Sequence, residues 1–257
     1  MHAREFIGHK GLRLVADVGG NPGNPPVILM HGGGQTRYSW GETAEALADN
    51  GFYVASLDLR GHGDSAWSRD GDYSIDCYVD DLRCVCSELG RPAALIGASL
   101  GGITALLAAG ESPQKIASAL ILVDIAPKVN AAGTEAIHRF MLSSPDGFGS
   151  LEEAADAVAR YLPHRPRPAD NSGLLKNLRR REDGRYCWHW DPQMLKIAPA
   201  SLEDGYGRMV RALRRVAVPT LLVRGGSSEL LTDDSVRDFL EHAPEAEYAV
   251  IGGAHHM

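Results

Sequence analysis

Ser99 lies in a Gly-Ala-Ser-Leu-Gly sequence, residues 97–101, whose spacing is typical of a catalytic serine. The apolar run 93–96 before it predicts a buried strand, and the run 103–109 after it predicts a helix closed by Gly110. A serine at such a junction occupies a strained turn that pushes its hydroxyl out above the sheet. The first N–H groups of the helix point at the same spot, where an oxyanion would form. The pattern predicts acyl transfer by a serine nucleophile; the alternative is an ordinary glycine-rich turn.

A second glycine-rich sequence, His-Gly-Gly-Gly at residues 31–34, follows the continuous apolar run 27–30. An apolar run without alternation is typical of a strand buried on both faces. Consecutive glycines directly after it permit unusual backbone angles and expose N–H groups that no side chain covers. We therefore expect this loop to supply a second oxyanion donor rather than to serve only as a flexible connection.

The elements that must position these groups alternate between strands and helices. A hairpin is predicted at residues 4–18, buried strands at 52–59, 119–125, 219–225 and 248–251, and helices at 39–50, 75–89, 206–215 and 233–242. Such alternation predicts an α/β protein with a mostly parallel, doubly wound sheet and helices on both faces. Active sites in this architecture gather at the carboxyl ends of strands. Ser99, Glu229 and the pair His255 and His256 all follow strands, in the order serine, acid, histidine.

The alternation breaks off between residues 127 and 200. This segment is rich in proline and has short amphipathic stretches at 135–142 and 151–161. A long structureless stretch is improbable inside a compact domain, so the segment predicts an inserted, mostly helical cap. The core domain would then comprise residues 1–126 and 201–257.

Five apolar side chains are candidates for contact with a substrate. Trp40 belongs to the apolar stripe of the helix predicted at 39–50, whereas Phe140, Met141, Trp188 and Trp190 lie in the cap. The four cap residues would either roof a pocket over the sheet or form the core of the cap itself.

Composition narrows the class of protein. A net charge of −7 with 44% hydrophobic and 23% charged residues is typical of a soluble globular protein and indicates no nucleic-acid partner. No apolar run approaches a membrane span, and the N-terminus lacks the apolar core of a signal peptide, so we expect a cytoplasmic protein with no membrane partner.

The four cysteines form no Cys-x-x-Cys motif and are interpreted as reduced thiols. The basic run 179–181 is interpreted as the solvated face of a helix.

No motif indicates a cofactor. The sequence has neither a Gly-x-Gly-x-x-Gly fingerprint nor a P-loop, and its histidines are scattered rather than spaced as metal ligands. We expect neither a cofactor nor a metal, and the expected partner is a small-molecule substrate.

Five motifs together make the chain resemble the α/β-hydrolase superfamily, in its serine-nucleophile, capped, esterase- or lactonase-like branch. They lie at residues 31–34, 58–65, 97–102, 122–127 and 253–256, so the resemblance covers the chain from about residue 27 onward, apart from the cap. It implies the α/β-hydrolase fold. His62, in the second motif, is interpreted as fixing a tight turn with Asp58 through hydrogen bonds rather than as a catalyst.

The resemblance also implies roles for single residues. Ser99 would be the nucleophile, and the N–H groups of Leu100 and Gly33 would form the oxyanion hole. A histidine would take the serine proton and later activate water. An acid would hold that histidine in the correct tautomer.

Two of these assignments have alternatives. Members of the family often end their last strand with Gly-Ala-Gly-His-Met, which places His256 in the catalytic position and leaves His255 as the alternative base. The family pattern Gly-x-x-Ser-Asp aligns with residues 225–229 and favours Glu229 as the acid. Asp124, which follows the strand at 119–125, is the alternative acid, because some members keep their acid there.

Members of the family usually carry a further helix after the catalytic histidine, whereas this sequence stops at Met257. This difference predicts that the sequence is a shortened form or a part of a longer chain.

A serine nucleophile excludes the branches of the family that use aspartate, such as haloalkane dehalogenases and epoxide hydrolases. We expect a serine hydrolase that cleaves a small ester, thioester or lactone through an acyl-enzyme. One alternative is a carbon–carbon bond hydrolase or a cofactor-free perhydrolase with the same triad. Another is a non-catalytic receptor for a small ligand on the same fold.

Overall fold

The computed structural model describes residues 1–163, 167, 169–196 and 202–254. Its strands are β1 (His2–Ile7), β2 (Arg13–Gly19), β3 (Pro26–Met30), β4 (Tyr53–Asp58), β5 (Ala93–Ala98), β6 (Ala117–Val123), β7 (Leu178–Arg180), β8 (Tyr186–Trp188), β9 (Thr220–Gly225) and β10 (Glu247–Ile251). Its α-helices are α1 (Gly41–Asp49), α2 (Ile75–Leu89), α3 (Leu100–Glu111), α4 (Ala131–Leu142), α5 (Leu151–Tyr161), α6 (Leu202–Leu213) and α7 (Asp233–His242). Short 3-10 helices lie at His9–Gly11, Arg37–Trp40, Ser172–Asn177 and Pro192–Lys196.

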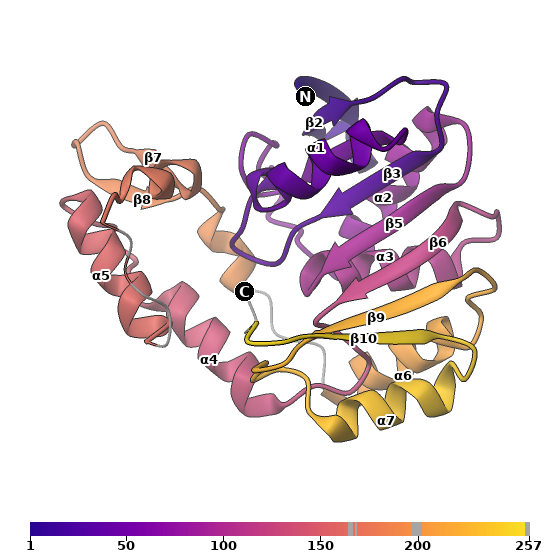
Figure 1. Cartoon of the computed structure of the whole chain (residues 1–257). Helices are drawn as coiled ribbons and strands as arrows, with labels where there is room; N and C mark the ends of the chain where they lie inside the picture. Colours follow the sequence, from indigo (N-terminus) through magenta and orange to yellow (C-terminus); the bar gives the residue numbers. More distant parts are fainter. Residues whose placement is uncertain (164–166, 168, 197–201, 255–257) are drawn as a thin grey trace.

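Eight of the strands form one twisted sheet in the order β1-β2-β4-β3-β5-β6-β9-β10 (Figure 1). β1 and β2 pair as the predicted antiparallel hairpin, and β2 pairs antiparallel with β4. From β4 to β10 all neighbouring strands are parallel. The prediction of a mostly parallel α/β sheet is therefore confirmed, with antiparallel pairing confined to one edge.

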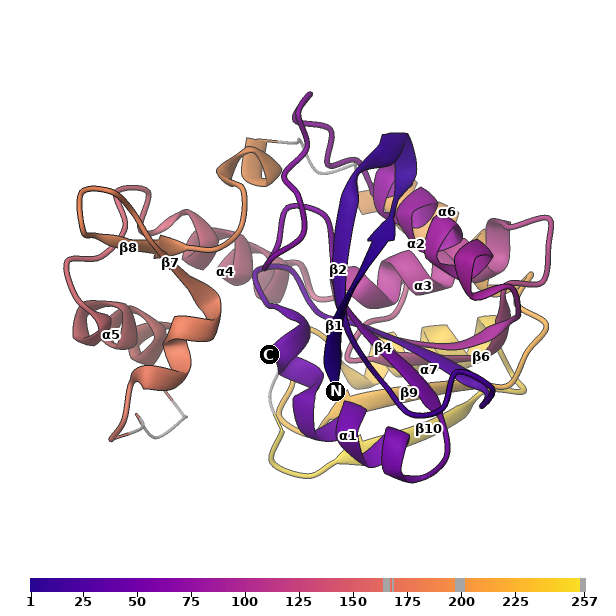
Figure 2. The ribbon, with the colours of Figure 1, turned by 90° about the horizontal axis from the view of Figure 1, so that it is seen from above.

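The strand β3 shows why its sequence is a continuous apolar run. Val27 and Leu29 pack on one face of the sheet with Ala44 of α1, whereas Ile28 and Met30 join the large core on the other face. That core is filled from α2, α3, α6 and α7, of which α2 and α3 lie behind the sheet in Figure 1 and beside each other in Figure 2. A strand covered on both faces has no polar side, so alternation is lost.

Helix α2 begins and ends as its pattern predicts. Its last residue, Leu89, is followed by Gly90 in the left-handed conformation (φ 70°), which closes the helix. Cys77 and Cys86 lie on its buried face as free thiols.

Among the helices in the described part of the chain, none has the length and apolar character needed to span a membrane.

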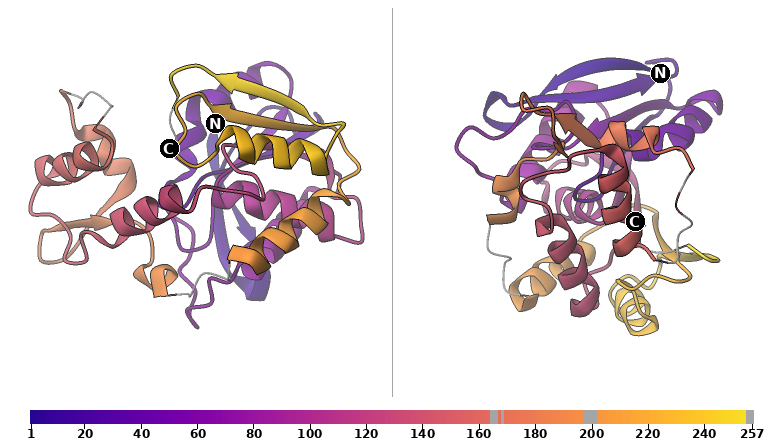
Figure 3. Two further views of the ribbon diagram at one scale, coloured as in Figure 1. Left: turned by 90° about the horizontal axis from the view of Figure 1, so that it is seen from below. Right: turned by 90° about the vertical axis from the view of Figure 1, so that its left-hand side faces the viewer.

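The segment between β6 and α6 forms a separate layer beyond the carboxyl ends of the parallel strands (Figures 1 and 3). It contains α4 and α5 and has its own apolar cluster around Phe148, Ala154 and Trp188. The interpretation of residues 179–181 as a helix face is wrong, because Arg179 and Arg180 belong to β7, which pairs antiparallel with β8. Strands of three residues are too short to leave a periodic signal.

Helix α3 approaches the sheet so closely that only glycine fits at the contacts. A Cβ atom on Gly97 would lie 2.3 Å from the carbonyl of Gly101, and a Cβ on Gly101 would lie 2.4 Å from the carbonyl oxygen of Met30. The obstacles are backbone atoms, which cannot rotate away as a side chain would. The two glycines therefore set the distance between α3 and the strands that precede it.

We predict that Gly101→Ala lowers the free energy of unfolding by about 3 kcal/mol, because the new methyl group forces the backbones apart. Gly41→Ala is the matched control, since a Cβ there meets nothing within 4 Å and the residue is the first of α1. Its free energy of unfolding should stay the same or rise by up to about 1 kcal/mol. Urea denaturation followed by circular dichroism measures both, and equal values for the two variants would contradict this account.

Candidate active site

Ser99 stands between β5 and α3 in a strained backbone conformation, with φ 45° and ψ −113°. Positive φ is uncommon for a residue with a side chain and marks a turn held by its surroundings. Here the Ser99 N–H donates to the carbonyl of Val123 (3.3 Å), and the Ser99 carbonyl accepts from the N–H of Ile103 (2.9 Å). The strand–turn–helix geometry that the motif predicts is present, and Ser99 is only partly buried.

The glycine loop after β3 lies beside Ser99, because a Cβ atom on Gly32 would be 3.5 Å from the Cβ of Ser99. Two of its N–H groups have partners: that of Gly32 donates to Oε1 of Gln35 (2.9 Å), and that of Gly34 donates to Nε2 of His62 (3.1 Å). The N–H of Gly33 makes no hydrogen bond to any described residue. Leu100 opens α3, so its N–H has no acceptor within the helix.

Three buried imidazoles lie close together around this loop. The ring of His62 is 4.8 Å from that of His31 and 5.8 Å from that of His189. Each ring accepts one backbone N–H and is close to one backbone carbonyl, so each is neutral with a defined tautomer. Burial lowers the pKa of all three from 6.5 to about 3, because the charged form loses its hydration.

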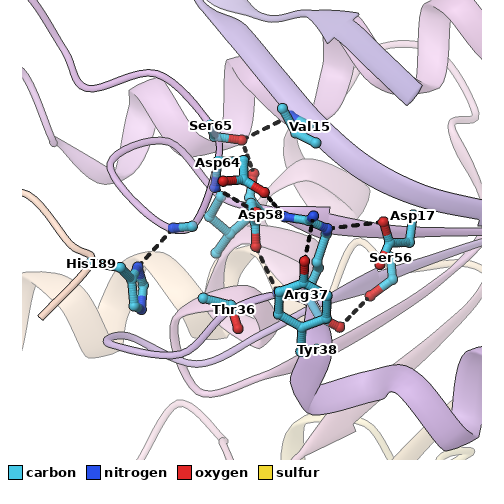
Figure 4. A network of polar contacts seen from close by, with 12 residues as sticks. Val15, Asp17, Thr36, Arg37, Tyr38, Ser56, Asp58, Asp64, Ser65 and His189 are labelled. Atoms are coloured by element: carbon cyan, nitrogen blue, oxygen red, sulfur yellow. Dashed lines mark hydrogen bonds and ion pairs between the residues drawn. The ribbon is translucent and has the colours of Figure 1, made fainter. Parts of the chain in front are cut away.

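A buried ion-pair network joins the glycine loop to the turn after β4 (Figure 4). The guanidinium of Arg37, whose side chain is 5% exposed, pairs with the carboxylates of Asp58, Asp17 (3.0 Å) and Asp64 (2.8 Å). Asp58 also accepts the N–H groups of Arg37 (2.7 Å) and Asp64 (2.8 Å). His62 Nδ1 lies 2.9 Å from the carbonyl of Arg60 and donates to it. The predicted structural role of Asp58 and His62 in this turn is confirmed by these contacts.

The two candidate acids have different environments. Asp124 directly follows β6 at positive φ (51°) and is 6% exposed. Its Oδ1 accepts the N–H of Gly225 (3.2 Å), and its Oδ2 accepts the hydroxyl of Ser228 (2.7 Å). Glu229 is exposed, and its carbonyl accepts from Nδ2 of Asn130 (3.1 Å). Asp124 is thus held in a defined orientation at the strand end next to Ser99.

The loop after β9 also holds the chain just before the two candidate histidines. The N–H of Ser227 donates to the carbonyl of Ala254 (2.8 Å), and that of Gly226 donates to the carbonyl of Ile251 (2.8 Å). Neighbouring residues of one loop, Ser227 and Ser228, therefore contact Ala254 and Asp124. His255 and His256 themselves lie outside the described residues.

Comparison with known proteins identifies the family. Residues 25–257 match the family model described as the alpha/beta hydrolase fold. The chain belongs to the α/β-hydrolase family.

Two relatives and one solved structure give further detail. This α/β hydrolase is 34% identical to the esterase Rv0045c of Mycobacterium tuberculosis over 225 residues, which are 85% of this chain and 72% of that protein. It is 26% identical to the 3-hydroxybutyrate-oligomer hydrolase of Cupriavidus necator over 251 residues, 91% of this chain and 85% of that protein. The crystal structure of E-2-(acetamidomethylene)succinate hydrolase shares the fold, with a TM-score of 0.84 at 23% identity over 99% of this chain and 91% of that one. The enzyme class of this chain is therefore hydrolase.

The α/β hydrolase brings only some of the predicted substrate-contact residues to the glycine loop. A Cβ atom on Gly34 would lie 3.2 Å from the ring of Trp190 and 3.3 Å from the methyl group of Met141. Phe140 and Trp188 instead pack inside the cap cluster, with their ring centroids 5.7 Å apart. Trp40 packs with the cluster on the α1 face of the sheet, away from the cap cluster.

Several residues around Ser99 and Asp124 were missed by the sequence analysis. Gln35 binds the N–H of Gly32, Ser228 orients Asp124, and His189 reaches the glycine loop from the cap. Ser228 could have been noticed as part of the Gly-x-x-Ser pattern after β9. Gln35 and His189 belong to no motif, and only the folded chain brings them to the glycine loop beside Ser99.

The buried histidines predict that stability falls on mild acidification. Their pKa values in the folded protein are below the unfolded value of 6.5, so the unfolded state binds more protons between pH 6.5 and about 3. Lowering the pH from 7.5 to 5.5 should therefore reduce the free energy of unfolding by roughly 1 kcal/mol for each histidine. Urea denaturation at both pH values measures this loss. His189→Gln should remove about a third of it, since glutamine does not titrate, and a stability independent of pH would refute the explanation.

Proposed function

We propose that this α/β hydrolase cleaves a small carboxylic ester, thioester or lactone through an acyl-enzyme on Ser99. The observation that carries the proposal is the strained turn of Ser99, which lies beside Gly32 of the glycine loop on one side and at the start of α3 on the other. Two relatives whose names are esterase and oligomer hydrolase support acyl transfer to water.

The reaction proposed for the site has two halves. His256 takes the proton from Oγ of Ser99 while Oγ attacks the carbonyl carbon of the substrate, and the Gly33 and Leu100 N–H groups stabilise the oxyanion. The leaving alcohol, thiol or ring oxygen receives that proton as the carbon–oxygen or carbon–sulfur bond breaks. Water then gives a proton to His256 and attacks the acyl-enzyme, and His256 returns that proton to Oγ of Ser99 as the bond between Oγ and the acyl carbon breaks and the acid leaves.

Asp124 is the acid that we propose, in place of Glu229, which the sequence pattern favours. A triad acid must hold its histidine rigidly, which is easiest for a buried carboxylate with fixed orientation. Hydrogen bonds from Gly225 and Ser228 fix the carboxylate of Asp124, and the adjacent Ser227 holds Ala254, the residue before the two histidines. Glu229 is exposed to solvent and has the longer side chain.

A fluorophosphonate probe tests the nucleophile, because it needs an activated serine and no particular substrate. We expect the probe to label Ser99, as located by peptide mapping, and Ser99→Ala to lose both the label and all but roughly a thousandth of any esterase activity. Ser118→Ala is the matched control, since Ser118 is an exposed serine of β6. A folded protein that stays unlabelled would reject the hydrolytic site in favour of a ligand receptor.

Two isosteric variants distinguish the acids. Asp124→Asn should lower kcat by roughly 10³-fold or more, because the amide stabilises the wrong histidine tautomer. Glu229→Gln should change kcat by less than tenfold. The assay is hydrolysis of p-nitrophenyl acetate by each folded variant. The reverse pattern would return the role of the acid to Glu229.

A further inference from the structure

His189 is a cap residue whose side chain lies within hydrogen-bond distance of the backbone of the glycine loop. It lies just after β8, and its side chain is 2% exposed. Its Nδ1 accepts the N–H of Gly63 (2.7 Å), as Figure 4 shows for the loop after β4. This bond places the ring proton on Nε2, which lies 3.3 Å from the carbonyl oxygen of Gly34 and can donate to it.

Imidazoles therefore hold both backbone groups of Gly34. His62 accepts its N–H, and His189 donates to its carbonyl. On the other side of Gly33, the N–H of Gly32 is held by Gln35. The peptide that carries the Gly33 N–H is held at its Gly32 carbonyl by His31 Nδ1 (2.7 Å) and by the Gln35 N–H (3.1 Å). The bonds to Gly34 fix the other end of this stretch, which glycines alone would leave free to rotate.

The cap segment that carries His189 is itself anchored in the core. The N–H of Asp191 donates to the carbonyl of Gly61 (2.9 Å), and its buried carboxylate accepts the hydroxyl of Tyr73 (2.6 Å). Between them, the ring of Trp190 rests against Gly34. Three consecutive cap residues contact the two loops that surround the proposed oxyanion hole.

We infer that His189 is a positioning residue for the oxyanion hole: it aims the Gly33 N–H, and it does so only while the cap segment 189–191 is seated on the core. The inference rests on the proposed function of Ser99. It adds that the rate of the chemical step depends on whether the cap segment 189–191 is seated on the core.

The direction of the Gly33 N–H should affect the rate of the chemical step and not the binding of the substrate. An oxyanion donor acts on charge that develops in the transition state, so a misdirected N–H slows the reaction and leaves ground-state binding unchanged. A residue that only stabilised the fold would not separate these two quantities.

Two substitutions separate the two hydrogen bonds of His189. The Oδ1 of asparagine can replace Nδ1 as the acceptor for Gly63, but the side chain is too short to reach Gly34. The Nε2 of glutamine can replace the imidazole Nε2 as the donor to Gly34. His189→Asn should lower the rate constant of fluorophosphonate inactivation, kinact, at least tenfold with an unchanged inhibition constant KI. His189→Gln should keep kinact within threefold of the unsubstituted enzyme.

The outcomes distinguish the inference from the function beneath it. If the unsubstituted enzyme is not labelled at all, the proposed function fails. If it is labelled and His189→Asn reacts at the same rate, or both variants lose the same activity, the positioning role is overturned while the proposed function stands.

Tyr73→Phe gives an independent test if the His189 variants do not fold. It removes the hydroxyl that binds Asp191 and leaves every direct contact of the glycine loop in place. We expect kinact to fall at least threefold with KI unchanged, since the cap segment loses an anchor. An unchanged kinact would overturn the link between cap seating and the oxyanion hole.

Discussion

A loop of three glycines has no side chains with which to hold its own conformation, and much of the polar interior is arranged around this constraint. In the proposed mechanism the loop after β3 keeps the Gly33 N–H in a fixed direction toward the oxyanion. It is held by groups from outside: Gln35 from the same connection, His62 from the turn after β4, and His189 from the cap. The flexibility that lets glycine adopt the required angles is also what makes these external contacts necessary.

The buried charges serve the same arrangement. Arg37 follows the glycine loop and Asp58 ends β4, and their ion pair ties the two loops together in the interior. Burying such a pair costs much of what its attraction supplies, so it adds little to net stability. Its clearer effect is to define a single geometry, because removing Arg37 would leave the buried carboxylate of Asp58 without a counter-charge. The three neutral histidines next to it add hydrogen bonds without further buried charge.

The cap and the core are joined by polar contacts and by a few apolar side chains such as Ile137 and Met194, which pack against the large core. The cap cluster around Phe148 and Trp188 is separate from the two clusters that cover the sheet. Across the seam, His189 and Asp191 contact the backbone of Gly63 and Gly61. Hydrogen bonds of this kind fix the orientation of the cap relative to the core, because they depend on direction as well as distance.

The sequence by itself determined the elements whose periodicity or glycine spacing is strong: the parallel strands, the helices α2 and α7, and the elbow at Ser99. These features depend on burial pattern and local backbone geometry, which neighbouring residues encode. Only the tertiary structure brings Asp124 to Gly225 and Ser228, because these residues lie about a hundred positions away from it in the chain. It also decided that Trp40 packs with the cluster that contains Ala44 of α1, that residues 178–180 form a strand, and that His189 meets Gly34 across 155 residues of sequence. Contacts between loops follow from how the whole chain packs, and no local pattern in the sequence records them.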